Sequence, residues 1–281
     1  MTTTVAMNTA VIPYRLIRRA FRSLRWSFRW KWIVGGFKQT KSHKKRHNNS
    51  LIARSQRYIR WGWRSLLVLI ALDVFYIMLI WPNWSHFKRG PVAKSEFIQL
   101  YEQQRRADRS LPRLAWQPVP MNSISPHIQR AVIVAEDSRF HSHSGFDVIA
   151  LKDAMDYNIE KLEMKYGAST ISQQTVKNMF FTASRNPLRK WHELVFTISM
   201  EFFVPKKRIL ETYLNIAEFG KGIFGVEAAA RHYWNIPASE LSLEQATELA
   251  ATLPSPKKHN PATRTKYFKR RASKIRRHLE M

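Results

Sequence analysis

The chain of 281 residues contains no cysteine. This absence excludes disulfide bonds, thiol nucleophiles and thiolate metal sites. Acidic residues are missing from one long region, because residues 1–64 hold sixteen Lys or Arg and no Asp or Glu. Residues 257–281 hold ten basic residues against a single acid, Glu280. The net charge of +27 therefore belongs to the two ends, and the segment between them is close to neutral.

An apolar run, SLLVLIALDVFYIMLIW, occupies residues 65–81, with tryptophans just outside both ends. Its length and its lack of a polar face predict a single transmembrane helix, at 65–82, rather than a buried core helix. A cleavable signal peptide is not expected, since the basic arm before the run is too long and no small-residue cleavage site follows it. The charge bias of the arm predicts that the N-terminus lies in the cytoplasm. The chain after the span is then expected on the outer side of the cytoplasmic (inner) membrane.

Asp73 is the unfavourable residue of this helix. A carboxylate at the centre of a bilayer costs about 2.5–3.5 kcal/mol on insertion scales. We therefore expect Asp73 to be protonated or to pair with a partner transmembrane helix.

The basic arm, residues 1–64, interleaves cations and aromatic rings in YRLIRRAFRSLRWSFRWKW, residues 14–32. This pattern fits nucleic-acid binding or an amphipathic helix on anionic lipid. The membrane span that follows favours lipid, so we expect no nucleic-acid partner. KSHKKRHNNS, residues 41–50, has the composition of a disordered linker.

Beyond the span the patterns are helical, and neither a β-hairpin nor a βαβ unit nor an internal repeat is evident. Ser125 and Pro126 predict the start of a helix that ends at Glu136. Pro205 predicts the start of a helix that stops near Gly220. A further helix is expected to begin at Asn186 and Pro187, with a buried stripe formed by Leu188, Trp191, Leu194, Val195, Ile198 and Phe202.

Three segments have the composition of catalytic or binding sites: EDSRFHSHSG at 136–145, GASTISQQTVKN at 167–178 and RKWHE at 189–193. Each segment also has a simpler interpretation. The first could be a solvated turn, the second a capped helix start, and the third a surface ion pair at i, i+4 spacing. A metal site in the first segment is disfavoured, because H-x-H with upstream acids is not a specific ligand spacing. Together the segments offer carboxylates on two helices with cations between them, which suits transfer from an anionic glycosyl donor.

Five segments in this order resemble the peptidoglycan glycosyltransferases, the family shared by class A penicillin-binding proteins and monofunctional transglycosylases. They are AEDSRFHSHSGFD, GASTISQQTVKNMFF, RKWHE, KKRILETYLNIAEFG and GIFGVEAAARHYW. The resemblance implies a mostly α, lysozyme-like domain of two lobes at 120–261, after a juxtamembrane segment at 83–119. The remaining 262–281 is expected to be a basic tail, solvated or lying on anionic lipid. We expect no transpeptidase domain, and Ala168 in place of a second glycine fits the monofunctional branch.

The resemblance also implies the reaction. The substrates would be lipid II and the growing glycan chain, and the product a β-1,4 glycan formed with inversion and release of undecaprenyl pyrophosphate. Glu136 matches the catalytic base. Glu193 matches the second carboxylate, which assists departure of the pyrophosphate directly or through a divalent cation such as Mg or Mn. No cofactor is required by the sequence, and the metal is unknown.

Further residues are carried over by their place in the motifs. Those expected to bind substrate are Ser169, Gln173, Gln174, Lys177, Asn178, Arg185, Arg189 and Lys190. Those expected to be structural are Asp137, Phe140, His143 and Gly145, and packing is the expected role of Glu211, Tyr213 and Asn215. Asp153 stands where many relatives carry a phosphate-binding cation, and whether Lys152 replaces it is open. The alternatives are a lytic enzyme of lysozyme type and a scaffold that binds lipid II without turnover.

Overall fold

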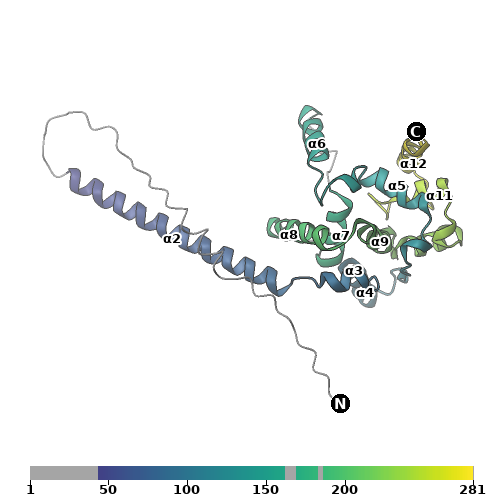
Figure 1. Cartoon of the computed structure of the whole chain (residues 1–281), viewed down its shortest axis with the longest axis horizontal. Helices are drawn as coiled ribbons and strands as arrows, with labels where there is room; N and C mark the ends of the chain where they lie inside the picture. The colour runs from purple at the N-terminus through teal and green to yellow at the C-terminus, as the bar shows by residue number, and fades with distance from the viewer. Residues whose placement is uncertain (1–43, 162–168, 183–185, 281) are drawn as a thin grey trace, which may run out of the picture. The chain divides into compact units, whose positions relative to one another are not determined.

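The computed structural model describes residues 44–161, 169–182 and 186–280, with side chains from Arg54 onward. The described chain is mostly helical, as predicted (Figure 1). Residues from Ile70 onward form one compact unit, separate from the unit before it. The α-helices are α2 Lys44–Leu79, α3 Trp84–Arg89, α4 Glu96–Ala107, α5 Pro126–Glu136, α6 Val148–Lys161, α7 Ile171–Phe180, α8 Pro187–Phe203, α9 Lys206–Ile216, α10 Val226–Trp234, α11 Leu243–Thr252 and α12 Lys266–Glu280. Short 3-10 turns lie at Met121–Ser123, Phe140–Ser142 and Ala238–Glu240.

The predicted membrane helix is part of the longer helix α2. Its segment Arg54–Leu79 is long and apolar enough to cross a bilayer. Side chains along it are exposed, as expected for a surface that lipid would cover; Leu67 is one example. The expected disordered linker at 41–50 is wrong for residues 44–50, which are helical. Hydrophobicity predicts which residues could cross the membrane. It does not predict where the helix begins in the basic sequence before them.

Helix α7 lies in the core of the compact unit, where it packs against α8 and α9. Its apolar positions Ile171 and Val176 are fully buried, and Phe196 of α8 and Leu214 of α9 complete this part of the core. These buried apolar side chains hold the three helices together. Gln174 and Lys177, also on α7, are only partly buried.

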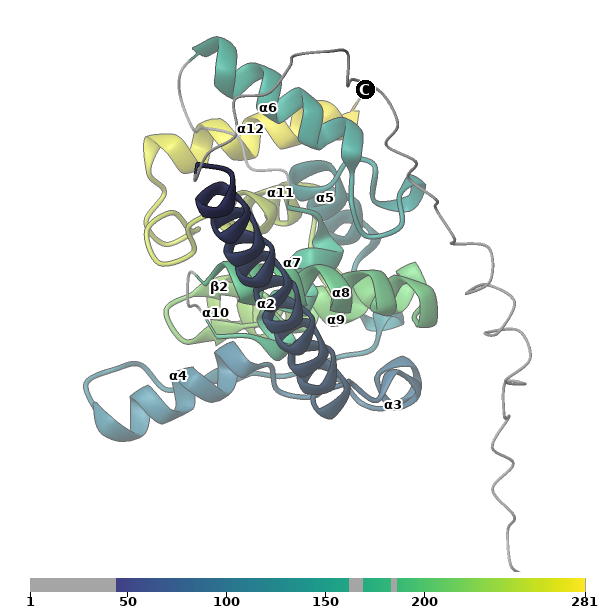
Figure 2. The ribbon, with the colours of Figure 1, turned by 90° about the vertical axis from the view of Figure 1, so that its left-hand side faces the viewer.

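Helices α5, α11 and α12 form a second packed group, and they lie side by side in both views (Figures 1 and 2). The α5–α11 contact is lined by small residues such as Ala131 and Ala250, which let the two helices approach closely. Phe268 and Ile275 of α12 are buried against this group. The segment 262–281 was expected as a separate tail beyond a domain ending at 261, but its helix α12 packs against α5 and α11.

A small sheet was not predicted. Its strands are β1 Ala115–Trp116, β2 Glu218–Gly220 and β3 Ile223–Phe224, in the order β1-β3-β2. β1 pairs with β3 in parallel, with Ala115 opposite Ile223, and β2 pairs with β3 antiparallel. Strands of two or three residues are too short to show an alternating pattern. The predicted helix end at Gly220 is also wrong, because α9 stops at Ile216 and Gly220 belongs to β2.

The buried stripe predicted for α8 is wrong as well. Leu188, Trp191, Ile198 and Phe202 are exposed, Phe202 to 82%. The buried face carries His192, Glu193, Phe196, Thr197, Ser199 and Met200 instead. The prediction assumed that the most apolar face of a helix packs inward, but this helix turns a partly polar face inward and leaves an apolar face outside.

Candidate active site

Glu136 is the last residue of α5. The helix begins as predicted, with Ser125 as N-cap and Pro126 in the first turn, and its buried residues Ile128 and Val132 fix its rotation. This arrangement brings the Glu136 carboxylate to the inside of the domain, where the side chain is 12% exposed. One oxygen, Oε2, accepts a hydrogen bond from Gln174 Nε2 at 3.0 Å. The other, Oε1, accepts one from Arg271 Nη2 at 2.8 Å.

The environment of Glu136 favours a proton acceptor. Burial raises the pKa of its carboxyl above the ordinary glutamate value, while the hydrogen bonds from Gln174 and Arg271 and the charge of Lys177 act in the opposite direction. A carboxylate with a raised pKa is a stronger base than one in water. The partners keep an ionised form accessible in spite of burial.

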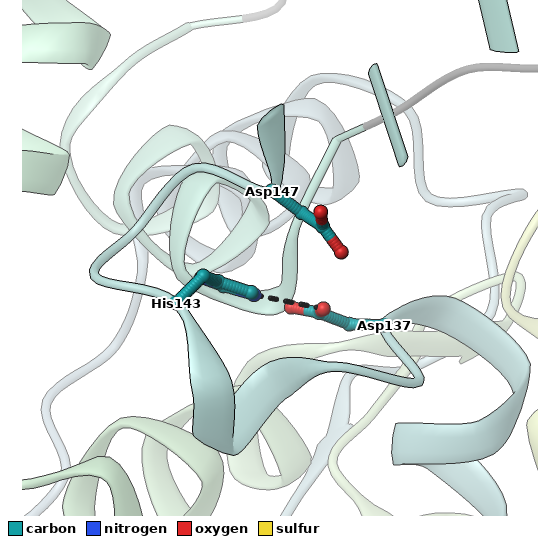
Figure 3. A group of neighbouring side chains, drawn as sticks. All are labelled: Asp137, His143 and Asp147. Atoms are coloured by element: carbon teal, nitrogen blue, oxygen red, sulfur yellow. Dashed lines mark hydrogen bonds and ion pairs between the residues drawn. The ribbon is translucent and has the colours of Figure 1, made fainter. Parts of the chain in front are cut away.

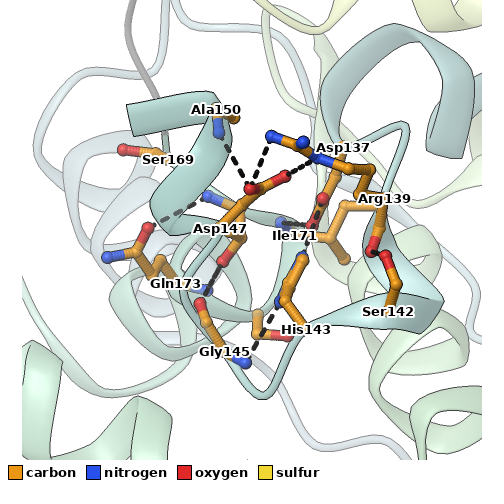
Figure 4. Close-up of polar contacts among 12 residues, drawn as sticks. Asp137, Arg139, Ser142, His143, Gly145, Asp147, Ala150, Ser169, Ile171 and Gln173 are labelled. Carbon is orange, nitrogen blue, oxygen red and sulfur yellow. Dashed lines mark hydrogen bonds and ion pairs between the residues drawn. The ribbon is translucent and has the colours of Figure 1, made fainter. Parts of the chain in front are cut away.

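The loop after Glu136 is held by its own side chains (Figure 4). Gly145 N donates to His143 Nδ1 at 3.2 Å, so His143 Nε2 carries the proton and donates to Asp137 Oδ1 at 2.9 Å. Asp137 Oδ2 accepts from Ile171 N at 3.0 Å, and Thr170 Oγ1 donates to Gly145 O at 2.6 Å. These bonds attach the loop to the N-terminus of α7 and thereby fix Glu136 relative to α7.

Asp137, His143 and Asp147 lie close enough together to resemble a metal site (Figure 3). Their polar atoms have other partners, however. Asp147 forms a bidentate pair with Arg139, at 2.7 and 2.8 Å, and also accepts from Ala150 N. Burial of Asp147 acts against ionisation, but the bonds from Ala150 and Arg139 prevail and lower its pKa. A guanidinium at this position is unfavourable for a bound cation, and the bonds of the three residues hold the loop in place.

Helix α7 supplies the next part of the site. Thr170 and Gln173 form a capping box at its start, which places Gln173 in a structural bond rather than in an open cleft. Gln174 and Lys177 lie one turn apart on a less buried face, where Gln174 is bonded to Glu136. Ser169 is exposed just before the helix, and Asn178 is half-buried near its end.

Glu193 sits in the middle of α8 and is more deeply buried than Glu136, with 3% of its side chain exposed. Arg189 Nη1 donates to its Oε2 at 2.9 Å, and Lys190 Nζ donates to its Oε1. The pair of Arg189 and Glu193, at i, i+4 spacing, is thus largely buried and is not a solvated surface contact. Burial lowers the pKa of Lys177, and the charges of both Glu193 and Glu136 act to raise it. Lys177 therefore lies within electrostatic reach of both carboxylates.

Residues 107–280 match the family model described as Transglycosylase. This chain belongs to the transglycosylase family. The biosynthetic peptidoglycan transglycosylase of Nitrosospira multiformis is 39% identical over 219 residues, which cover 77% of this chain and 94% of that protein. Those of Aromatoleum aromaticum and Rhodospirillum centenum are 41% and 48% identical, over 72% and 57% of this chain and 87% and 69% of theirs. The resemblance read from the five segments is confirmed.

Two residues of this transglycosylase reach the site although no role in it was predicted for them. Tyr213 of α9, expected to be packing, donates from its hydroxyl to Gln174 Oε1 at 3.0 Å and so orients the amide that holds Glu136. Burial raises its pKa well above the ordinary tyrosine value, so it stays a neutral donor. Arg271 comes from the segment expected to be a tail. The only sequence signal for Tyr213 was its place in the fourth motif, and Arg271 had none.

Other predicted residues of the transglycosylase show no contact with this site among the described residues. Arg185 lies outside the described residues. Lys152 and Asp153 are exposed on α6, and whether Lys152 replaces the phosphate contact stays untested. Asn215 holds Val119 through two backbone bonds at 2.8 and 2.9 Å, which is the packing role expected of it.

Asp73 has partners within the chain. Its Oδ1 lies 2.7 Å from His192 Nε2, and its Oδ2 accepts from Trp191 Nε1 at 3.0 Å. These bonds from α8 give both carboxylate oxygens a partner, and the predicted partner transmembrane helix stays untested. Because His192 directly precedes Glu193, the membrane helix is joined to the helix that carries the second carboxylate.

Proposed function

We propose that this transglycosylase polymerises lipid II into β-1,4 glycan strands and releases undecaprenyl pyrophosphate. The observation that carries this proposal is a pair of buried carboxylates on separate helices. Glu136 at the end of α5 has the environment of a base, and Glu193 on α8 is held by two cations. The charges of both carboxylates also act on Lys177. A glycosyl transfer from a pyrophosphate needs both parts, a proton acceptor and a cluster of positive charge.

The chemistry assigns one task to each part. Glu136 takes the proton from the 4-hydroxyl of the acceptor N-acetylglucosamine, and that oxygen forms a bond to C1 of the N-acetylmuramic acid at the lipid-linked end. The bond from C1 to the pyrophosphate oxygen breaks on the opposite face, so the configuration inverts. The pyrophosphate leaves with the electron pair, and Lys177, Arg189 and Lys190 stabilise the charge that develops on it.

A divalent cation at the pyrophosphate fits the described residues poorly. Glu193 is the carboxylate at this end of the site, and both of its oxygens are engaged by Arg189 and Lys190. Mg²⁺ or Mn²⁺ at a pyrophosphate would take its oxygen ligands from the phosphates and from one or two protein carboxylates. Here the carboxylate is already held by two side-chain cations, which also repel a metal ion. We therefore assign the stabilisation of the leaving group to side-chain cations.

We further propose that the catalytic domain rests on the outer face of the inner membrane, with the N-terminus in the cytoplasm. The sixteen basic residues before the span favour this orientation. Large apolar side chains remain exposed on two helices, among them Trp191 and Phe202 of α8 and Val148 and Ile159 of α6. Exposed apolar surface of this extent suits contact with lipid, where the polyprenyl tail of the substrate remains.

The test is a polymerisation assay with the purified full chain and labelled lipid II, with and without chelator. We expect polymer in both, and none from Glu136→Gln. Release of fragments from intact sacculi without polymer would instead support a lytic enzyme. Binding of lipid II without turnover would support a scaffold. Activity lost on chelation and restored by Mg²⁺ would contradict the assignment to side-chain cations.

A further inference from the structure

Helix α12 places one of its many cations against Glu136. Arg271 Nη2 donates to Glu136 Oε1 at 2.8 Å and to the carbonyl oxygen of Ala135 at 3.2 Å. The Ala135 carbonyl is among the last of α5, where helical carbonyls lack partners within their own helix. A single nitrogen of the Arg271 guanidinium thus caps the C-terminal end of α5 and also binds the carboxylate of Glu136.

The position of Arg271 on α12 separates it from the other basic residues there. Phe268, Ala272 and Ile275 form the buried face of this helix, and Arg271 lies three residues after the first and four before the last. Its side chain is 26% exposed, and its Nε is buried without a hydrogen bond among the described residues. Lys269, Arg270, Lys274 and Arg277 are exposed. The apolar stripe that docks α12 therefore turns Arg271 inward and its basic neighbours outward.

The other groups around Glu136 do not replace this contact. From α7, Gln174 is a neutral donor and Lys177 acts through its charge without a hydrogen bond to Glu136. From α9, Tyr213 contacts Gln174. The adjacent Asp137 is engaged by His143 and Ile171. From α11, Glu248 is paired with Arg264 at 2.9 Å. Among the described residues, Arg271 is the cation in direct contact with the carboxylate.

We propose that Arg271 is a positioning residue for the Glu136 base, so that α12 is part of the active site and not an accessory basic helix. The inference rests on the proposed function. A buried carboxylate without a cation is easily protonated and then accepts no proton from a hydroxyl. With Arg271 on Oε1 and Gln174 on Oε2, each oxygen keeps a lone pair for the acceptor sugar, and the carboxylate plane is fixed.

The experiment measures the initial rate of lipid II polymerisation against pH, with the full chain and the variants Arg271→Gln and Arg270→Gln. Glutamine keeps a donor for the Ala135 carbonyl but removes the charge. We expect the acid limb of the Arg271→Gln profile to move up by about 1–3 pH units, because Glu136 then binds its proton more tightly. Arg270→Gln, which removes an exposed charge from the next residue, should leave the limb unchanged.

A purely structural role for Arg271 predicts a different result. The rate would fall by the same factor at every pH, together with the melting temperature, and the acid limb would stay in place; that result would overturn the inference. If Arg271→Gln does not fold, Arg271→Lys decides. It keeps the charge but loses the planar donor, so we expect kcat to fall about tenfold without a rise in KM. An unchanged kcat would then contradict a positioning role.

A result that contradicts the proposed function can be distinguished from one that contradicts only the role of Arg271. If Glu136→Gln polymerises lipid II as well as the unmodified enzyme, Glu136 is not the base, whatever Arg271 does. If Glu136→Gln is inactive and the Arg271 variants leave both the limb and kcat unchanged, the base assignment holds and only the role of Arg271 is lost.

Discussion

The two carboxylates of the site are held in opposite ways. Glu193 takes its partners from its own helix, three and four residues earlier in the chain. Glu136 takes its partners from helices 38 and 135 residues away, and one of the two is a neutral amide. Glu193 is thus locked to two cations, while Glu136 has one cation and a raised pKa. The difference suits an electrostatic role for the first and proton transfer for the second.

The largest effect that this comparison predicts is the loss of the base. Glu136→Gln keeps the shape and the hydrogen-bonding capacity of the side chain but accepts no proton, so we expect polymerisation to fall about 10²–10⁴-fold. Glu193→Gln should fall less, because the cations that face the pyrophosphate remain. Initial rates at saturating lipid II measure both, and a smaller loss for Glu136→Gln than for Glu193→Gln would reverse the assignment.

A second prediction concerns the ion pair on α8. Among the described residues, Arg189→Leu leaves the buried Glu193 carboxylate with Lys190 as its donor in direct contact, and we expect the free energy of unfolding to fall by about 1–3 kcal/mol. The exposed pair of Arg276 and Glu280 has the same i, i+4 spacing, which makes Arg276→Leu a matched control. Its expected loss is much smaller, because solvent screens the pair. Equal losses in chemical denaturation would contradict the buried character of the α8 pair.

A third prediction separates Tyr213 from an ordinary buried tyrosine. Tyr213→Phe removes the donor that orients Gln174, and Tyr233→Phe removes a comparable bond, at 2.8 Å to the carbonyl of Phe219. Both variants should lose about 0.5–1.5 kcal/mol of stability. Only Tyr213→Phe should lower kcat, by several-fold, because its bond leads to Glu136. Equal kcat values in the two variants would show that Tyr213 serves packing alone.

The smallest effect is a displacement of the pH profile of the unmodified enzyme. The base must be ionised, so activity falls as pH drops through the pKa of Glu136, which burial raises above 4.5. Lys177 must be charged, so activity falls as pH rises through a pKa that burial lowers from 10.5. We therefore expect a bell narrower than these two ordinary values would give. An acid limb at or below the ordinary glutamate value would contradict the burial of the base.

The contrast between Glu193, with local partners, and Glu136, with distant partners, also separates what could be predicted from the sequence from what could not. The partners of Glu193 were predictable, because residues three and four apart face each other on any helix. The Thr170 and Gln173 cap was also recognisable, although its presence makes Gln173 a structural residue. Tyr213 and Arg271 were not predictable as partners of the base. Their contacts depend on how separate helices pack, and local periodicity holds no information on that.

The fold shows the same limit. Helix α8 begins where Asn186 and Pro187 predict, but the choice of its buried face was wrong, because an apolar stripe does not reveal whether protein or another apolar phase covers it. Asp73 is the converse case. The sequence identified it as a polar group in need of a partner, and the tertiary structure provides His192 and Trp191.

The sequence was sufficient to predict a helix apolar enough to cross a membrane and to identify the family, because hydrophobic length and motif spacing are local properties of the chain. The packing of the helices was needed to show which face of α8 is buried, that the basic helix α12 is part of the domain, and that Arg271 reaches Glu136. The physical reason is that burial and long-range hydrogen bonds arise when helices pack. A basic residue can be surface charge or part of a catalytic site, and the packing of its helix decides between them.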